Sequence, residues 1–364
     1  SHSSWLSRCC GQYLAGTLPL IASPMRQPEP EHRKERKMVK ALQQWSAVGA
    51  ITAMVMVVAA YRRDIDRAYE RILGKSTVIA SSYGDIEYTE CGAGPHVLAI
   101  HGSGGGYDQG ELIVQSFLDN RFHWIAPSRF GYLRSTFRDG ATFDDQANAY
   151  AALLDHLGVK RVAVVAVSHG GPSALLFAVL YPERVSSLTL VSTGVATITT
   201  ENQGQAGQMG RTLATLFKYD WLYWGMTRLF KKQIMGLMGA TDAVIAELTP
   251  RQQELVDRII EEMNPVSLRS AGALFDNRAT LPGDRVAAIR APTLIFHATD
   301  DTLQLFHNAE FAAATIPGAR LVQFDRGGHL LMAVEQATIR TAVQQHILDH
   351  ASDPLVLEGV QVLV

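Results

Sequence analysis

An apolar run from Val162 to Val167 leads directly into Ser168-His169-Gly170-Gly171, and few folds accommodate such a junction. Four of the six residues in the run are valine, which favours a buried strand. The two glycines and the proline after them favour a sharp turn and the start of a helix. Small residues stand two positions before and after the serine, so strand and helix can approach closely. The sequence predicts a strand, a tight turn and a helix, with the serine at the apex and Gly170 and Gly171 in support.

Short apolar runs alternate with segments of helical periodicity from about Thr77 onward. Parallel strands that are buried on both faces have this appearance, and the segments between them become helices that cover the sheet. We therefore predict an α/β fold with a mostly parallel, doubly wound sheet. Further buried strands are expected at 96–100, 123–127, 188–191, 293–296 and 321–324, after an antiparallel strand at 85–89. Helices are expected at 144–157, 172–181 and 334–350.

One interval, residues 195–281, breaks the alternation and is typical of several helices rich in methionine and aromatic residues. We predict a helical lid inserted after the sixth core strand. The lid would divide the core into 62–194 and 282–351 and leave a C-terminal tail at 352–364. Most of its aromatic residues are expected to hold the lid together, and the others to face the site.

The N-terminal region shows a different pattern. Residues 1–40 lack sustained apolar periodicity and are expected to form a disordered leader. Residues 41–61 carry no charge and are flanked on both sides by basic residues, which is typical of a signal peptide or membrane anchor. A buried helix packed on the core is the alternative. We expect the protein to be membrane-associated through this segment or exported, rather than cytoplasmic.

Composition excludes several other classes of function. The chain has 33 basic and 35 acidic residues, for a net charge of -2, and no long basic run in the globular part. Nucleic-acid binding therefore has no electrostatic basis here. The three cysteines, Cys9, Cys10 and Cys91, cannot build a disulfide framework or a zinc site. No histidine-rich ligand spacing suggests a metal.

A glycine-rich loop, residues 101–106, follows directly after the strand at 96–100. Such a loop can point backbone N–H groups at a developing negative charge. The expected donors are the amide of Ser103 and that of His169, at the N-terminus of the helix after the serine. We expect His101 to brace the loop together with Gly102. A nucleotide cradle is disfavoured because neither G-x-G-x-x-G nor a P-loop lysine is present.

The remaining polar residues follow two late strands. The strand at 293–296 leads into Asp300 and Asp301, and the strand at 321–324 leads into His329. His329 is placed to take the proton of Ser168 as a general base, and an aspartate would fix its tautomer. Adjacent residues point in different directions, so only one of the two aspartates can reach the histidine. Residue order alone leaves that choice open.

Between Tyr83 and Ala351 the chain resembles the α/β-hydrolase superfamily, in its serine-nucleophile, esterase-like branch with an inserted helical cap. The resemblance selects Asp301, three residues after a small residue that ends its strand, as the partner of Ser168 and His329. The chain departs from the family pattern at Ala166 and Ala298, where glycine is usual, and at Ser128, where aspartate is frequent.

This resemblance implies acyl chemistry, because a serine nucleophile argues against the aspartate-based dehalogenases and epoxide hydrolases. A carboxylic ester with a hydrophobic portion is the expected substrate, with no cofactor and no metal. Lipases, lactonases, carbon–carbon hydrolases and cofactor-free perhydrolases or lyases share the same residues. A ligand-binding or sensing module with little turnover is the alternative outside enzymes.

Overall fold

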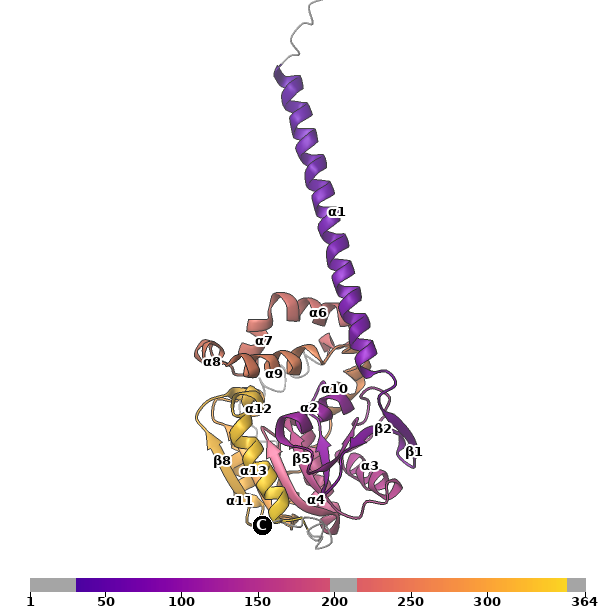
Figure 1. The fold of residues 1–364 in the computed structure, drawn as a ribbon, viewed down its shortest axis with the longest axis vertical. Helices are drawn as coiled ribbons and strands as arrows, with labels where there is room; N and C mark the ends of the chain where they lie inside the picture. Colours follow the sequence, from indigo (N-terminus) through magenta and orange to yellow (C-terminus); the bar gives the residue numbers. More distant parts are fainter. Residues whose placement is uncertain (1–30, 197–214, 352–364) are drawn as a thin grey trace, which may run out of the picture. The chain divides into compact units, whose positions relative to one another are not determined.

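The computed structural model describes residues 31–196 and 215–351. The chain divides into two compact units, one that ends at Ala59 and one that begins at Ala60. The helix α1 (Glu31–Ile72) starts in the first unit, and its last turns belong to the second. All strands and all other described helices lie in the second unit (Figure 1).

Helix α1 changes the predicted N-terminal boundary. The prediction of a disordered leader through residue 40 is wrong for residues 31–40, which are helical. Their many Glu, Lys and Arg residues have high helix propensity, so the helix forms without apolar periodicity. Residues 1–30 of that leader lie outside the described residues. The side chains of α1 through Ala59 are exposed, and the helix is long and apolar enough to cross a membrane by length and composition.

The second unit is built on one eight-stranded sheet with the order β1-β2-β4-β3-β5-β6-β7-β8. Strands β1 and β2 pair antiparallel, as do β2 and β4, and every other neighbouring pair is parallel. The predicted fold class is therefore confirmed. The strands are β1 (Thr77–Ser81), β2 (Gly84–Cys91), β3 (His96–Ile100), β4 (His123–Pro127), β5 (Val162–Val167), β6 (Val185–Val191), β7 (Thr293–Ala298) and β8 (Arg320–Phe324).

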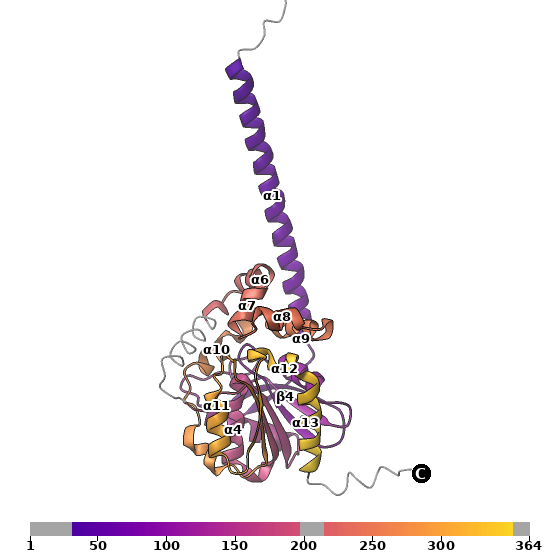
Figure 2. The same ribbon diagram turned by 90° about the vertical axis from the view of Figure 1, so that its left-hand side faces the viewer.

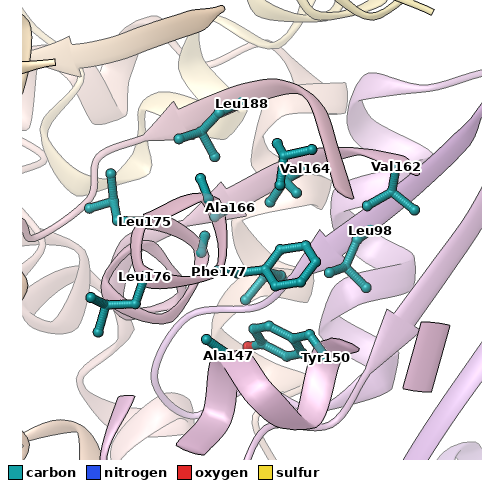
Figure 3. Packing of buried hydrophobic residues seen from close by; sticks show 14 of the residues in the cluster. Leu98, Ala147, Tyr150, Val162, Val164, Ala166, Leu175, Leu176, Phe177 and Leu188 are labelled. Carbon is teal, nitrogen blue, oxygen red and sulfur yellow. The ribbon is translucent and has the colours of Figure 1, made fainter. Parts of the chain in front are cut away.

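Helices cover both faces of the sheet (Figure 2). Residues of β5 alternate between the two sides: Val164 and Ala166 belong to one buried cluster, and Ala163 and Val165 to the other. Burial on both faces explains why β5 is apolar at every position. Figure 3 shows the first cluster, in which Ala166 and Val164 face helix α4. The first cluster includes residues of α3 (Phe143–His156), α4 (Gly171–Leu180) and α11 (His307–Thr315). The second includes residues of α2 (Tyr107–Phe117), α12 (Leu331–Val334) and α13 (Gln336–Asp349).

A helical insertion stands between β6 and β7, where the lid was predicted. Residues 197–214 of that lid lie outside the described residues. Helix α9 begins at Pro250: Thr249 caps it, and Gln252 completes a capping box. Among the described residues the insertion contains α6 (Asp220–Leu229), α7 (Lys231–Leu237), α8 (Asp242–Glu247), α9 (Pro250–Glu261) and α10 (Ser270–Asp276).

The last turns of α1 pack on α2 and on the helical insertion within the second unit. Ile72 is buried, and its carbonyl oxygen accepts a hydrogen bond of 2.6 Å from the hydroxyl of Tyr107. The Asp64 carboxylate accepts hydrogen bonds from the Trp224 indole at 3.1 Å and from Arg228 at 3.0 Å. The C-terminal end of α1 is thus held by α2 and by α6 of the insertion.

Candidate active site

Ser168 occupies the turn between β5 and α4 and begins a short 3-10 turn, Ser168–Gly170. Its φ of 53° lies in the left-handed region, which is costly for a residue with a side chain. The turn is also crowded, because a Cβ at Gly170 would lie 2.7 Å from the carbonyl oxygens of Ile100 and His101. A Cβ at Gly102 would lie 2.9 Å from the Cβ of Ser168. Backbone strain of this kind is typical of functional residues.

The structure brings Ser168, His329 and Asp301 together. His329 lies in the turn Gly328–Leu330 after β8, and its Nε2 is 2.8 Å from Ser168 Oγ. Its Nδ1 is 2.9 Å from Asp301 Oδ2. The serine side chain is thus hydrogen-bonded to a potential base, and the base is oriented by a carboxylate. All three follow carboxyl ends of parallel strands, at one edge of the sheet.

Asp301 is held as an anion. Its Oδ1 accepts the backbone amides of Leu303 and Gln304, both at 2.9 Å. Burial alone would raise the pKa of this carboxyl, yet the neighbouring His329 and the hydrogen bonds bring the pKa below its ordinary value. At neutral pH the carboxylate is therefore ionised and can stabilise a positive charge on the histidine.

Asp300 has a different position. Its carboxylate accepts the amides of Gly328 at 2.7 Å and Gly327 at 3.2 Å. These two glycines precede His329, so Asp300 orders the loop that carries the histidine and does not contact the ring itself. Asp300 therefore stabilises the turn before His329.

The predicted amide donors belong to His169, which follows Ser168 directly, and to Ser103, which follows Gly102, a residue packed against Ser168. Within residues 31–196 and 215–351, the Ser103 amide has no hydrogen-bond acceptor. His169 follows the serine at the first turn of a helical segment, where amides lack intrahelical acceptors. Both amides are thus suited to bind an oxyanion. No cluster of three His, Cys, Asp or Glu residues that could hold a metal is present in the described part of the chain.

His101 braces the glycine-rich loop from a fully buried position. Its Nδ1 is 2.7 Å from the carbonyl oxygen of Gly102, and its Nε2 accepts the amide of Arg129 at 3.0 Å. Burial and the nearby Arg129 guanidinium hold the pKa of His101 well below its usual range. The ring is therefore neutral with its proton on Nδ1, and both nitrogens are occupied by backbone groups.

A buried ion pair beneath this loop was missed by sequence reasoning. Arg129 and Asp276 are fully buried and joined by two hydrogen bonds, of 2.6 and 2.7 Å. Tyr132 donates a hydrogen bond of 2.5 Å to the same carboxylate, and its oxygen also lies 3.4 Å from the Gly104 amide. The two charged partners are 147 residues apart in the chain, and no local pattern connects them.

Replacing Asp276 with alanine is expected to lower the free energy of unfolding by about 3–5 kcal/mol, because Arg129 would remain buried without a counter-charge. Chemical denaturation followed by circular dichroism measures this change. Asp284→Ala, at an exposed position in the same unit, is the control and should change stability by less than about 0.5 kcal/mol. Equal denaturation midpoints for the two variants would contradict the assigned role of the ion pair.

The helical insertion contacts two loops of this site. The backbone amide of His329 donates a hydrogen bond of 2.7 Å to the carbonyl oxygen of Met238, just after α7. At the other loop, Phe217 lies so close to Gly104 that a Cβ there would be 2.9 Å from the phenylalanine ring. The insertion therefore contacts both the loop of the potential base and the loop of the potential oxyanion donors.

A buried arginine adds a further link. Arg269 donates to the carbonyl oxygen of Gly105 at 2.6 Å and to the Asp108 carboxylate at 2.9 and 2.7 Å. Arg71, in the last turn of α1, hydrogen-bonds the same carboxylate. Burial would raise the pKa of Asp108, but the two arginines hold it well below its usual range. The glycine-rich loop is therefore tied to both the insertion and the end of α1.

Comparison with known proteins agrees with this architecture. Residues 95–336 match the model of the α/β hydrolase fold family. An uncharacterised hydrolase of Bacillus subtilis, YcgS, is 29% identical over 261 residues, which cover 70% of this chain and 91% of that protein. The 2-hydroxy-6-oxo-6-phenylhexa-2,4-dienoate hydrolase of Burkholderia cepacia is 26% identical over 262 residues, covering 67% of this chain and 84% of that protein.

Solved structures show the same fold. A thermophilic esterase from Thermogutta terrifontis aligns with a TM-score of 0.61 at 22% identity, covering 77% of this chain and all of the esterase. At that level of identity the likeness concerns the fold alone. Because the family model matches about two thirds of the sequence, this chain belongs to the α/β hydrolase fold family and is a hydrolase of that family.

Proposed function

We propose that this chain is a serine hydrolase that cleaves a carboxylic ester or a related acyl bond. The observation that carries the proposal is the hydrogen-bonded series from Ser168 Oγ to His329 Nε2, at 2.8 Å, and from His329 Nδ1 to Asp301, at 2.9 Å. A ligand-binding module needs a pocket, but it does not need a strained serine with a proton acceptor and an ionised orienting carboxylate. Turnover is therefore the better interpretation than sensing.

The reaction follows from these contacts. Ser168 Oγ attacks the carbonyl carbon while His329 Nε2 accepts the hydroxyl proton, and the ionised Asp301 stabilises the resulting imidazolium. The amides of Ser103 and His169 bind the oxyanion of the tetrahedral intermediate. As that intermediate collapses, the bond to the leaving oxygen breaks and His329 protonates the departing alcohol. An acyl-enzyme ester remains on Ser168.

The second half repeats the chemistry with water. His329 accepts a proton from a water molecule, whose oxygen attacks the acyl carbon of the intermediate. Collapse releases the carboxylic acid and returns the proton to Ser168 Oγ. The net reaction consumes one ester and one water and yields one acid and one alcohol, so no redox or metal cofactor is needed.

A second candidate is hydrolysis of a 2-hydroxy-6-oxo-dienoate. It is favoured by one observation: the Burkholderia cepacia relative, 26% identical over 84% of its own length, is named for that reaction. The same serine and histidine would serve. Loss of the absorbance of the dienoate, measured beside ester hydrolysis, distinguishes the two substrates.

We also propose that α1 anchors the chain to a membrane. Residues 41–61 carry no charge, basic residues flank them, and the side chains of α1 through Ala59 are exposed. A helix with these properties lowers its free energy by entering a bilayer. A membrane enzyme would meet esters with long apolar portions, which supports a hydrophobic substrate.

Labelling with a fluorophosphonate probe tests the proposed serine chemistry. We expect the full-length protein in mild detergent to be labelled on Ser168, as identified by peptide mass spectrometry. Labelling should be lost in Ser168→Ala and retained in Ser187→Ala, where a buried serine of β6 is removed. Folded wild-type protein that resists the probe and hydrolyses no p-nitrophenyl ester would overturn the proposal.

A further inference from the structure

The surface of α6 carries an unusual set of exposed apolar side chains. Most of the large apolar residues exposed in the second unit lie within one short stretch, 219–237. Trp221 is 59% exposed and Leu229 is 75% exposed. We define the outer face of α6 by the exposed residues Tyr219, Trp221, Leu229 and Phe230.

Helical spacing explains why Trp221 and Leu229 share one side, and Tyr219 and Phe230 flank the helix at its two ends. Leu229 follows Trp221 by eight residues, so the two lie on the same face of α6. The buried residues of the helix, Tyr223 and Thr227, are four residues apart and form the opposite face. The helix therefore packs on the insertion with one face and presents a second apolar face outward. A cluster of this kind marks a binding surface for an apolar partner.

The end of the charge-free segment lies beside α6. The ring of Tyr61, the last residue of that segment, packs edge-on against Trp224 with centroids 5.5 Å apart. The carboxylate of Asp64, one turn later, accepts hydrogen bonds from Trp224 and Arg228. If residues 41–61 span a bilayer, its surface lies within a few residues of Tyr61. Trp224 of α6 then contacts the residue at which the chain leaves the bilayer.

The chemistry of the outer face fits a lipid interface. Tryptophan and tyrosine are enriched where a bilayer meets water, because their rings are apolar and their polar groups remain hydrated. Lys218 is exposed close to this face and would attract anionic headgroups, whereas the exposed Lys232 is ion-paired with Asp242 at 3.0 Å. The combination of aromatic, aliphatic and basic residues is typical of a helix that lies in a lipid interface. It is less typical of a surface that binds a soluble peptide.

We propose that the outer face of α6 inserts into the interface of the bilayer that holds α1, and that the substrate is an acyl ester drawn from that bilayer. This proposal rests on the proposed function and on the anchoring of α1.

The position of α6 in the chain supports delivery of substrate to the site. Phe217, just before α6, packs against Gly104 in the loop of the oxyanion donors. Met238, just after α7, accepts the amide of His329. The segment between these two contacts contains the whole outer face. We therefore expect a lipid ester that leaves the bilayer at α6 to reach the site near these two loops.

Fluorescence quenching tests the contact with lipid. Full-length protein with Cys9, Cys10 and Cys91 changed to serine would carry one new cysteine, Leu229→Cys or the control Leu180→Cys, labelled with an environment-sensitive dye. Leu180 ends α4 and is also exposed, at 39%. In vesicles of phosphatidylcholine and phosphatidylglycerol, brominated acyl chains should quench the dye at position 229 and leave that at 180 unchanged. Equal quenching at both positions, or cross-linking of two copies through position 229, would overturn the proposal.

Activity assays test the source of the substrate. Leu229→Asp is expected to lower hydrolysis of a long-chain ester dissolved in the vesicles by about tenfold or more, because the lost leucine no longer favours insertion. Hydrolysis of water-soluble p-nitrophenyl acetate should stay unchanged, and Leu180→Asp should affect neither substrate. Equal long-chain rates for the two variants, with acetate hydrolysis intact, would overturn the membrane source alone. Absence of acetate hydrolysis and of fluorophosphonate labelling in the wild type would instead overturn the proposed hydrolase.

Discussion

Replacing His329 with alanine is expected to lower kcat for p-nitrophenyl ester hydrolysis by about 10⁵- to 10⁶-fold. The reason is that in the proposed mechanism His329 Nε2, 2.8 Å from Ser168 Oγ, accepts the proton of the serine. An alcohol that keeps its proton is a weak nucleophile, and the leaving alcohol would also depart without a general acid. Ser168→Ala should lower kcat to a similar extent. The double variant should be no slower than either single variant, because the two residues act as one unit.

Fixed-time assays with long incubation and concentrated enzyme measure these low rates, and circular dichroism checks that the variants fold. His156→Ala removes an exposed histidine at the end of α3 and serves as the matched control, with kcat unchanged. If kcat of His329→Ala stayed within about tenfold of the wild type, a different base would be required. If the fold-losses of kcat from the two single substitutions multiplied in the double variant, Ser168 and His329 would not act as one unit.

Much of the fold could be predicted because its central strands are buried on both faces. β5 and its turn combine β-branched residues, glycines and a proline in an order that leaves one interpretation. Helix α2 was not predicted, because Gly106 precedes it without a side-chain cap and Gly110 interrupts its apolar pattern. That glycine is required by packing on the sheet: a Cβ there would lie 2.6 Å from the Cβ of Ala126. The packing of α2 on β4 thus requires a glycine that, read locally, argues against a helix.

The same distinction applies to the candidate site. Ser168, His329 and the pair Asp300 and Asp301 each follow a strand and so carry a local signal, and the family resemblance selected Asp301 from that pair. The buried partner Asp276 lies in the insertion and meets Arg129 through tertiary packing alone. The face of α6 that remains exposed also depends on how the helix packs, which a single sequence does not determine. The candidate catalytic residues could therefore be predicted from the sequence. The buried residues that support them, and the exposed face of α6, could not.

The roles of the two adjacent aspartates can be separated by one matched pair of substitutions. Asp301→Asn is expected to lower kcat by about 10⁴-fold, while its fold is retained. The amides of Leu303 and Gln304 hold Oδ1 of residue 301, so an asparagine would keep its oxygen there and turn its NH₂ group toward His329 Nδ1. That nitrogen would then have to accept a hydrogen bond. The proton of the neutral ring would move to Nε2, which could no longer accept the proton of Ser168.

Asp300→Asn removes a carboxylate at the neighbouring position and should have a much smaller effect. An asparagine oxygen can still accept the amide of Gly328, the shorter of the two hydrogen bonds at 2.7 Å, so only the bond from Gly327 at 3.2 Å is lost. We expect kcat to fall less than about tenfold, because the loss of one hydrogen bond contributes about 1 kcal/mol. Rates for both variants at neutral pH, where Asp301 of the wild type is ionised, provide the comparison. Should Asp300→Asn prove the slower enzyme, the aspartate that orients His329 during turnover would have to be reassigned, and the contact of Asp301 with the ring would be structural.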